Sequence, residues 1–276
     1  MPNEIPQFFL NSRRQRLYSI LHLADATQKQ HDFAVVFCAP LFEEKLWSHR
    51  VLVNYARSLA AQGIAALRFD YFGDGESEGR FEEATVTSRV ADILDAVEFC
   101  RSRAGVRRIV LLGLGYGAVL ALAAARTGDV DGIVAWAPIM SGEQYTSDLL
   151  RAHLGAQVVL HRKVIHDREA LVQKIMNGEF VNIEGYEIGN PFFSELVATD
   201  TRKLIEEQTR PVVVVQIAPG ERIDSQYASF AQSTDSRVQF FPVRELKFWA
   251  QQKTIYSPCE LLFQRTTQWL IETRAA

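Results

Sequence analysis

Three glycines alternate with two larger residues in the stretch Gly113-Leu114-Gly115-Tyr116-Gly117, directly after an apolar run. This is the spacing of a nucleophile elbow, G-x-S-x-G, in which a serine on a strained turn projects its hydroxyl over the edge of a sheet. Such a serine attacks an acyl carbonyl when a histidine accepts its proton and a carboxylate orients that histidine. Here the central residue is Gly115, so the turn has the spacing of the motif without its nucleophile.

The elements on either side of this turn indicate how it would be held. Residues 108–112 are basic or branched apolar, led by the β-branched Ile109 and Val110, which is typical of a buried strand. Residues 118–126 are almost all small and apolar, and they predict the most buried helix of the protein. The sequence therefore predicts a strand, a tight turn and a helix at this place.

Buried strands alternate with amphipathic helices along most of the chain. This alternation predicts an α/β protein with a mostly parallel sheet and helices on both faces. Residues 8–10 and 17–23 alternate between apolar and polar side chains and predict an antiparallel hairpin at the sheet edge. Ser48 is the expected N-cap of the first helix. We expect parallel strands over 34–38, 64–69, 132–137, 211–217 and 238–243, and helices over 48–62, 87–102, 225–232 and 258–273.

Residues 139–208 break this alternation. Helical patterns cover 145–154 and 168–175, and glycines interrupt the remainder without another buried strand. We expect this segment to be a cap inserted over the carboxyl edge of the sheet. No repeat or low-complexity linker divides the chain, so residues 1–276 are predicted to form one domain.

Composition limits the classes of function. A formal net charge of −3 and an isoelectric point of about 6.1 give no electrostatic footprint for nucleic acid. The cysteines Cys38, Cys100 and Cys259 are scattered and form no C-x-x-C pair, so we expect reduced thiols in a cytoplasmic protein. We recognise no signal peptide, and no apolar run approaches the roughly 18 residues of a membrane-spanning helix.

The order of these elements resembles the α/β-hydrolase fold, with an elbow on the central strand and a cap after the next one. The resemblance covers essentially the whole chain. Local stretches are also similar to one bacterial branch, the hydrolase-like proteins found with exosortase and exopolysaccharide systems, which are related to serine aminopeptidase-type hydrolases. These stretches are Ala39-Pro40-Leu41-Phe42-Glu43-Glu44, residues 69–79, Trp136-Ala137-Pro138 and Ser141-Gly142.

The resemblance assigns an address to each member of a catalytic triad, in the chain order nucleophile, acid, histidine. The nucleophile address is Gly115. The acid address follows the strand over 211–217, where Asp224 is the first candidate and Glu221 the second. The histidine address follows the strand over 238–243, where the sequence has Lys247 and no histidine. Two of the three positions therefore depart from the pattern, and the proton relay that activates a hydroxyl is missing.

The resemblance also implies a ligand pocket. The oxyanion site of this superfamily uses the amide after the nucleophile, here Tyr116, and one after the first parallel strand, here Leu41 or Phe42. Main-chain amides remain whatever the side chains are, so binding of an anion or a carbonyl stays open. With Ser141 at the start of the cap, the predicted pocket comprises Leu41, Phe42, Gly115, Tyr116, Ser141, Asp224 and Lys247.

A relocated nucleophile is the alternative to a lost one. Ser77, Ser141 and Cys38 should all lie near the carboxyl ends of strands, but none has a histidine partner in the matching loop. Ser141 also fits a turn at the start of the cap, and Cys38 fits a small apolar core residue. An active esterase, thioesterase or acyltransferase would need one of these three groups.

Cofactor and metal sites are weaker alternatives. Gly113, Gly115 and Ala118 satisfy the dinucleotide-binding pattern G-x-G-x-x-A, but no acid ends the following strand. No H-x-x-x-H spacing occurs, and the acidic glycine loop with Asp74, Glu76 and Glu78 is more typical of a solvated loop than of a cation site. We therefore predict no cofactor and no metal.

These observations lead to one hypothesis with alternatives. The chain is predicted to be a hydrolase-like pseudoenzyme that binds a small acyl or ester-type ligand, or serves as an accessory protein with a protein partner. A bacterial envelope or exopolysaccharide pathway is implied only by the resemblance.

Overall fold

The computed structural model describes residues 3–250 and 257–275, and its centre is an eight-stranded sheet. The strand order is β1-β2-β4-β3-β5-β6-β9-β10. The β1–β2 and β2–β4 pairs are antiparallel and all other neighbours are parallel, as the sequence predicts. The strands are β1 (Asn3–Leu10), β2 (Arg16–Leu23), β3 (Phe33–Cys38), β4 (Ala65–Phe69), β5 (Arg108–Leu114), β6 (Gly132–Trp136), β9 (Val212–Ala218) and β10 (Val238–Arg244).

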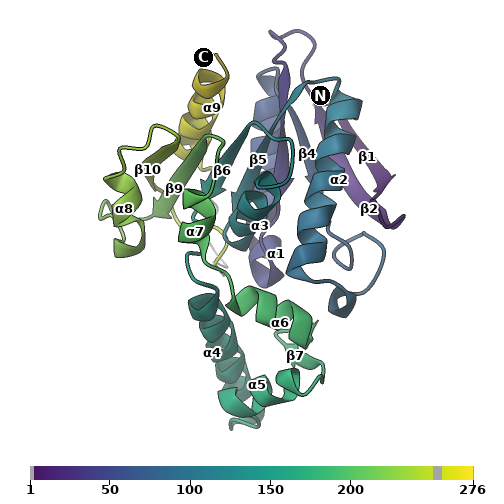
Figure 1. The fold of residues 1–276 in the computed structure, drawn as a ribbon, viewed down its shortest axis with the longest axis vertical. Coiled ribbons are helices and arrows are strands. Elements are labelled where there is room, and N and C mark those ends of the chain that lie inside the picture. Colours follow the sequence, from purple (N-terminus) through teal and green to yellow (C-terminus); the bar gives the residue numbers. More distant parts are fainter. Residues whose placement is uncertain (1–2, 251–256, 276) are drawn as a thin grey trace.

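Helices cover both faces of the sheet (Figure 1). Side chains of α2 and α3 form one apolar cluster with Val36 and Leu111, whereas α1 and α9 form a second cluster with Val35 and Val110. Neighbouring strand residues thus enter different clusters, as the alternation of a strand requires. The helices are α1 (Phe42–Ala61), α2 (Val86–Ala104), α3 (Tyr116–Ala125), α8 (Ala228–Ala231) and α9 (Glu260–Ala275), with 3-10 turns η1 (Phe81–Glu83) and η2 (Ser225–Tyr227).

Two helix boundaries differ from the predictions. Helix α1 begins at Phe42, six residues before the expected start, and Ser48 is a buried residue inside it rather than its N-cap. The acidic side chains of Glu43 and Glu44 stand in its first turn, where they complement the positive end of the helix dipole. The helix expected over 225–232 divides into the turn η2 and the four-residue helix α8.

We call the segment 139–208 the cap segment. Most of it extends away from the sheet, whereas its last helix, α7 (Thr201–Glu206), lies beside α3 (Figure 1). Helix α4 packs against α6, and α5 contacts both. A short antiparallel hairpin, not predicted from the sequence, lies between α5 and α6. The elements are α4 (Gly142–His161), α5 (Arg168–Met176), β7 (Val181–Ile183), β8 (Tyr186–Ile188), α6 (Asn190–Val197) and α7 (Thr201–Glu206).

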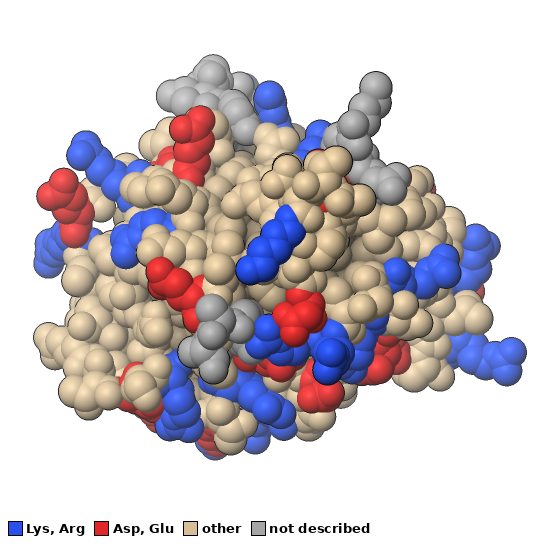
Figure 2. Space-filling model, turned by 90° about the horizontal axis from the view of Figure 1, so that it is seen from above, with Lys and Arg blue, Asp and Glu red and all other residues tan. Residues whose placement is uncertain are grey.

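The surface carries both charges without a field of one sign on the face seen from above. Blue and red side chains are interspersed there (Figure 2), which agrees with the small net charge. Within residues 3–250 and 257–275, no helix is long and apolar enough to cross a membrane.

Candidate functional site

The turn at Gly115 keeps the backbone of an elbow. Gly115 joins β5 to α3 with φ 57° and ψ −122°, a conformation that costs a residue with a side chain about 1–3 kcal/mol and glycine little. Its N–H donates to the carbonyl of Trp136 on the neighbouring strand at 3.0 Å. The turn is thereby fixed to the carboxyl edge of the sheet.

The flanking glycines are required by close packing. A Cβ on Gly113 would lie 2.3 Å from the carbonyl carbon of Gly117, inside the start of α3. A Cβ on Gly117 would lie 2.2 Å from the carbonyl oxygen of Cys38, at the end of β3. Both positions therefore need glycine so that strand, turn and helix can meet.

A glutamate side chain occupies the space over Gly115. A Cβ at this position would lie 2.8 Å from Oε2 of Glu44, in the first turn of α1. This oxygen is shielded from solvent and has no hydrogen-bond partner among the described residues, although part of the side chain is exposed. Burial raises the pKa of the Glu44 carboxyl to about 7. A titratable carboxyl group thus lies where the elbow nucleophile would project.

Aromatic rings connect the elbow to the cap segment. The Tyr116 and Thr199 hydroxyls are hydrogen-bonded at 2.7 Å, and the Tyr116 ring stacks on Tyr145 of α4 with centroids 5.4 Å apart. Phe42 has a positive φ of 54°, which is strained for a bulky residue. Its ring lies under the cap segment, 5.1 Å from the ring of Tyr186 and 6.1 Å from that of Phe192.

Two neighbouring cavities lie between the sheet edge and the cap segment. The first has a volume of about 430 Å³, the second about 620 Å³, and they share Ile139, Tyr145, Asp148 and Trp249. The first is also lined by Ala137, Pro138, Met140, Ser141, Gln144, Ile217, Asp224, Gln226, Tyr227 and Lys247. The second is also lined by Phe42, Glu43, Glu44, Trp47, Leu149, Ala152, Glu184 and Ala250. We call the second the acidic cavity.

The structure brings only part of the predicted pocket to these cavities. Ser141, Asp224 and Lys247 line the first cavity, and Phe42 lines the acidic one. Leu41, Gly115 and Tyr116 are buried and are not among the lining residues of either cavity. Glu44 lines the acidic cavity and also covers Gly115, so it lies between this cavity and the elbow.

Sequence reasoning did not identify Glu44, Asp148 or Trp249 as site residues. Glu44 belongs to one of the stretches that carry the family resemblance, and its position directly after the predicted oxyanion residues was the available signal. Two consecutive glutamates at a helix start are also common as dipole-complementing residues. The direction in which each of them points is not encoded in that pattern.

Known structures with the same architecture cover nearly the whole chain. Est1E from Butyrivibrio proteoclasticus, solved with ferulic acid, superposes with a TM-score of 0.66 at 16% identity, covering 98% of this chain and 100% of that one. The chain has the α/β-hydrolase fold. An esterase of Pyrococcus furiosus gives a TM-score of 0.64 at 14% identity, with 99% and 92% covered. Proline iminopeptidase from Mycobacterium smegmatis gives 0.64 at 15%, with 98% and 99% covered.

Sequence comparison adds a partial match. The family described as serine aminopeptidase, S33, matches residues 46–177, slightly less than half of this α/β-hydrolase-like chain. The matched part contains the elbow and much of the cap segment, but neither the acid nor the histidine address. Among curated proteins, none matches the chain in sequence.

Asp224 and Lys247, the residues predicted for the acid and histidine addresses, both line the first cavity. Asp224 caps the turn η2 and is exposed, and its N–H donates to Oε1 of Gln216 at 2.9 Å. The second candidate acid, Glu221, is not among the lining residues and lies 3.7 Å from Arg244 as an ion pair. Lys247 is exposed in the loop after β10. The described cavity walls contain no histidine.

The possible substitute nucleophiles hold structural contacts. Burial raises the pKa of the Cys38 thiol, which disfavours the reactive thiolate. The Ser77 hydroxyl donates to the carbonyl of Asp70 at 2.7 Å and accepts from the N–H of Tyr18 at 2.9 Å. Ser141 caps α4 by accepting from the N–H of Gln144 at 3.2 Å, and it lines the first cavity.

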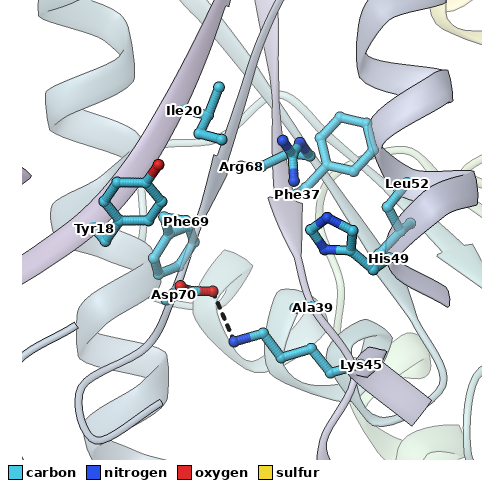
Figure 3. Close-up of a pocket in the computed structure, with 10 residues that line it drawn as sticks. All are labelled: Tyr18, Ile20, Phe37, Ala39, Lys45, His49, Leu52, Arg68, Phe69 and Asp70. Carbon is cyan, nitrogen blue, oxygen red and sulfur yellow. Dashed lines mark ion pairs between the residues drawn. The ribbon is translucent and has the colours of Figure 1, made fainter. Parts of the chain in front are cut away.

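A third, smaller pocket of about 90 Å³ lies beside β2, β4 and α1 (Figure 3). Its charged groups include Lys45, Arg68 and Asp70, and His49 also lines it. Lys45 lies 2.7 Å from Oδ1 of Asp70 and 3.1 Å from Oδ1 of Asp74. This pocket contains none of the predicted site residues.

Proposed function

We propose that the protein binds a small organic ligand in the two cavities over the elbow and does not turn it over with a Ser-His-Asp triad. The observation that carries this proposal is the elbow itself. Its backbone is that of a nucleophile turn, yet position 115 has no side chain and the carboxyl group of Glu44 covers it. Such a site favours binding of a ligand over its hydrolysis by a triad.

The neighbourhood supports a ligand of the acyl or ester type. Esterases are among the proteins with similar structures, and ligands bind at this edge of an open α/β sheet. Both cavities are large enough for a small organic molecule. An accessory role in an envelope or exopolysaccharide pathway extends the proposal on the strength of the sequence resemblance alone. A cytoplasmic location extends it on the strength of the scattered cysteines.

Labelling with a fluorophosphonate tests the loss of the triad. This probe reacts with a serine that a histidine activates. We expect no labelling of the full-length protein under conditions in which an active serine esterase is labelled completely. Stoichiometric labelling that disappears after heat denaturation would refute the proposal.

An acyl-ester hydrolase with a relocated nucleophile is the second candidate, and one observation favours it. Ser141 lines the first cavity together with Asp224 and Lys247. This candidate predicts ester turnover that Ser141→Ala abolishes, while Ser77→Ala leaves turnover unchanged. Absence of turnover across a panel of acyl esters, with an intact fold by circular dichroism, contradicts it.

A further inference from the structure

The acidic cavity combines carboxylates with aromatic walls. Its described lining contains four carboxylates, from Glu43, Glu44, Asp148 and Glu184, and no lysine, arginine or histidine. Four aromatic rings line the same space, those of Phe42, Trp47, Tyr145 and Trp249. This combination is suited to an organic cation, because carboxylates neutralise the charge and ring faces attract it.

Two of the four carboxylates have donors of their own among the described residues. Asp148 forms an ion pair with Arg151 at 2.9 Å. Oε1 of Glu184 lies 3.3 Å from Nδ1 of His153, but this nitrogen accepts from the N–H of Glu184, and Oε1 is a second buried acceptor without a hydrogen-bond donor among the described residues. Glu43 interacts with the hydroxyl of Tyr186 through a hydrogen bond. The contacts of Asp148 and Glu43 hold these two carboxylates in place.

Glu44 differs from Asp148 and Glu43. Its Oε2 is buried and has no donor among the described residues, and no ion pair is formed by its carboxylate there. A buried acceptor without a donor costs about 1–3 kcal/mol unless something satisfies it. A ligand that brings both a positive charge and an N–H group would do so, which a neutral or purely apolar ligand would not.

We propose that the acidic cavity binds a ligand with a primary ammonium group, and that Glu44 accepts a hydrogen bond from this group. The inference rests on the proposed function, since it names the class of ligand for the same site. The ammonium group lies over the elbow glycine, between the Glu44 carboxylate and the aromatic walls. The remainder of the ligand extends toward the first cavity, which shares four lining residues with this one.

The neighbouring groups set the charge that Glu44 experiences. The other titratable groups that line this cavity are neutral when protonated and negative when ionised. They are Glu43, Asp148, Glu184 and the Tyr145 hydroxyl. The adjacent Lys45 is directed to Asp70 in the other pocket (Figure 3). The described walls therefore leave the charge of Glu44 available to a cationic ligand.

Calorimetric titration of the full-length protein at pH 8 with three matched probes tests this inference. The probes are 3-phenylpropylamine, its N-trimethyl derivative and 3-phenylpropan-1-ol, which share one apolar body. We expect the primary amine to bind about tenfold more tightly than the alcohol, from charge pairing and cation–π attraction. The trimethyl derivative should fall between them because it has the charge but no N–H donor.

The variant Glu44→Gln distinguishes binding by this carboxylate from attraction of the cation by the other acidic and aromatic side chains of the cavity. We expect it to lose the preference for the amine and to keep the affinity for the alcohol. The matched control is Glu206→Gln, which removes the same charge from an exposed position in the last turn of α7 and should leave all three affinities unchanged.

Each outcome decides between specific alternatives. If the amine and the alcohol bind equally, or if Glu44→Gln keeps the preference, the ammonium inference is wrong while ligand binding in the cavities stands. If none of the probes binds, the inference is also overturned. Fluorophosphonate labelling is independent of all these results, so failure of the proposed function is recognised separately.

Discussion

Two adjacent side chains of α1, Glu44 and Lys45, line different pockets and differ in whether their charge has a partner. Lys45 enters the small pocket beside β2 and β4, where Oδ1 of Asp70 lies 2.7 Å from its ammonium group (Figure 3). Oδ1 of Asp74 lies 3.1 Å from the same ammonium group. Glu44 enters the acidic cavity, where Oε2 has no partner among the described residues. One turn of helix therefore carries one paired and one unpaired charge.

The difference indicates which of the two sites is built for stability. For a partly buried cation between two carboxylates, the ion pairs offset the free-energy cost of desolvation. A buried carboxyl without a partner destabilises the fold and is retained where a function requires it. We therefore read the Lys45 pocket as structural and the Glu44 cavity as functional.

The largest expected effect concerns the pH dependence of stability at Glu44. Its pKa is about 7 in the fold and near 4.5 in the unfolded chain. Between these values the folded state holds the proton that the unfolded state has released, so stability falls as pH rises. We expect wild type to lose about 2 kcal/mol between pH 5 and 8 relative to Glu44→Gln, after allowance for partial exposure.

Urea denaturation of both proteins at the two pH values measures this difference. All other titrating groups contribute equally to wild type and variant, so the comparison isolates position 44. An identical pH dependence in both proteins would show that Glu44 is not desolvated.

Replacing Lys45 should lower the stability of the fold, whereas Glu44→Gln should raise it at high pH. Lys45→Met removes the cation of Asp70 and leaves Asp74 only the more distant Arg89 at 3.7 Å, and both carboxylates are about one-fifth exposed. We expect a loss of about 1–2 kcal/mol at pH 7 and no change in probe affinity. The control Lys203→Met breaks an exposed pair at 4.0 Å and should cost less than about 0.5 kcal/mol. If Lys45→Met also lost affinity for the amine probe, the small pocket and the acidic cavity would not be independent sites.

A double-mutant cycle examines the contact between Glu44 and the elbow. Gly115→Ala adds backbone strain of about 1–3 kcal/mol and a methyl group 2.8 Å from Oε2 of Glu44. The strain is the same when Glu44 is already alanine, but the contact is absent. We expect a coupling energy of about 0.5–1 kcal/mol from thermal unfolding of the four proteins. Additive effects would mean that Glu44 does not cover the elbow.

The fold was largely predictable because its signals are local and repeated. Continuous β-branched runs identify the parallel strands, and the small-residue helix after the elbow is as buried as its composition predicts. The start of α1 was missed because Phe42 adopts a positive φ that its residue type disfavours. The hairpin of β7 and β8 was missed because strands of three residues are too short to display a period.

The site was less predictable than the fold. The addresses at Asp224 and Lys247 follow from strand ends, and both residues line one cavity. The position of Glu44 depends on which of two neighbouring glutamates points inward, and this is decided by tertiary packing. Leu41 and Tyr116, which were predicted as pocket residues, are buried and line neither cavity, and this burial has no signature in the sequence.

The smallest expected effect is a gain of ester hydrolysis. Gly115→Ser with Lys247→His restores a nucleophile and a base at their addresses, with Asp224 as the acid in the same cavity. In this double variant the new hydroxyl must still compete with Oε2 of Glu44, which lies 2.8 Å from the Cβ position. Adding Glu44→Ala should therefore raise the turnover of 4-nitrophenyl butyrate above that of the double variant. The same triple variant with Asp224→Asn is the control. Equal rates with and without Glu44 would show that this carboxyl does not occupy the place of the nucleophile, and the contrast between Glu44 and Lys45 would then lose its functional meaning.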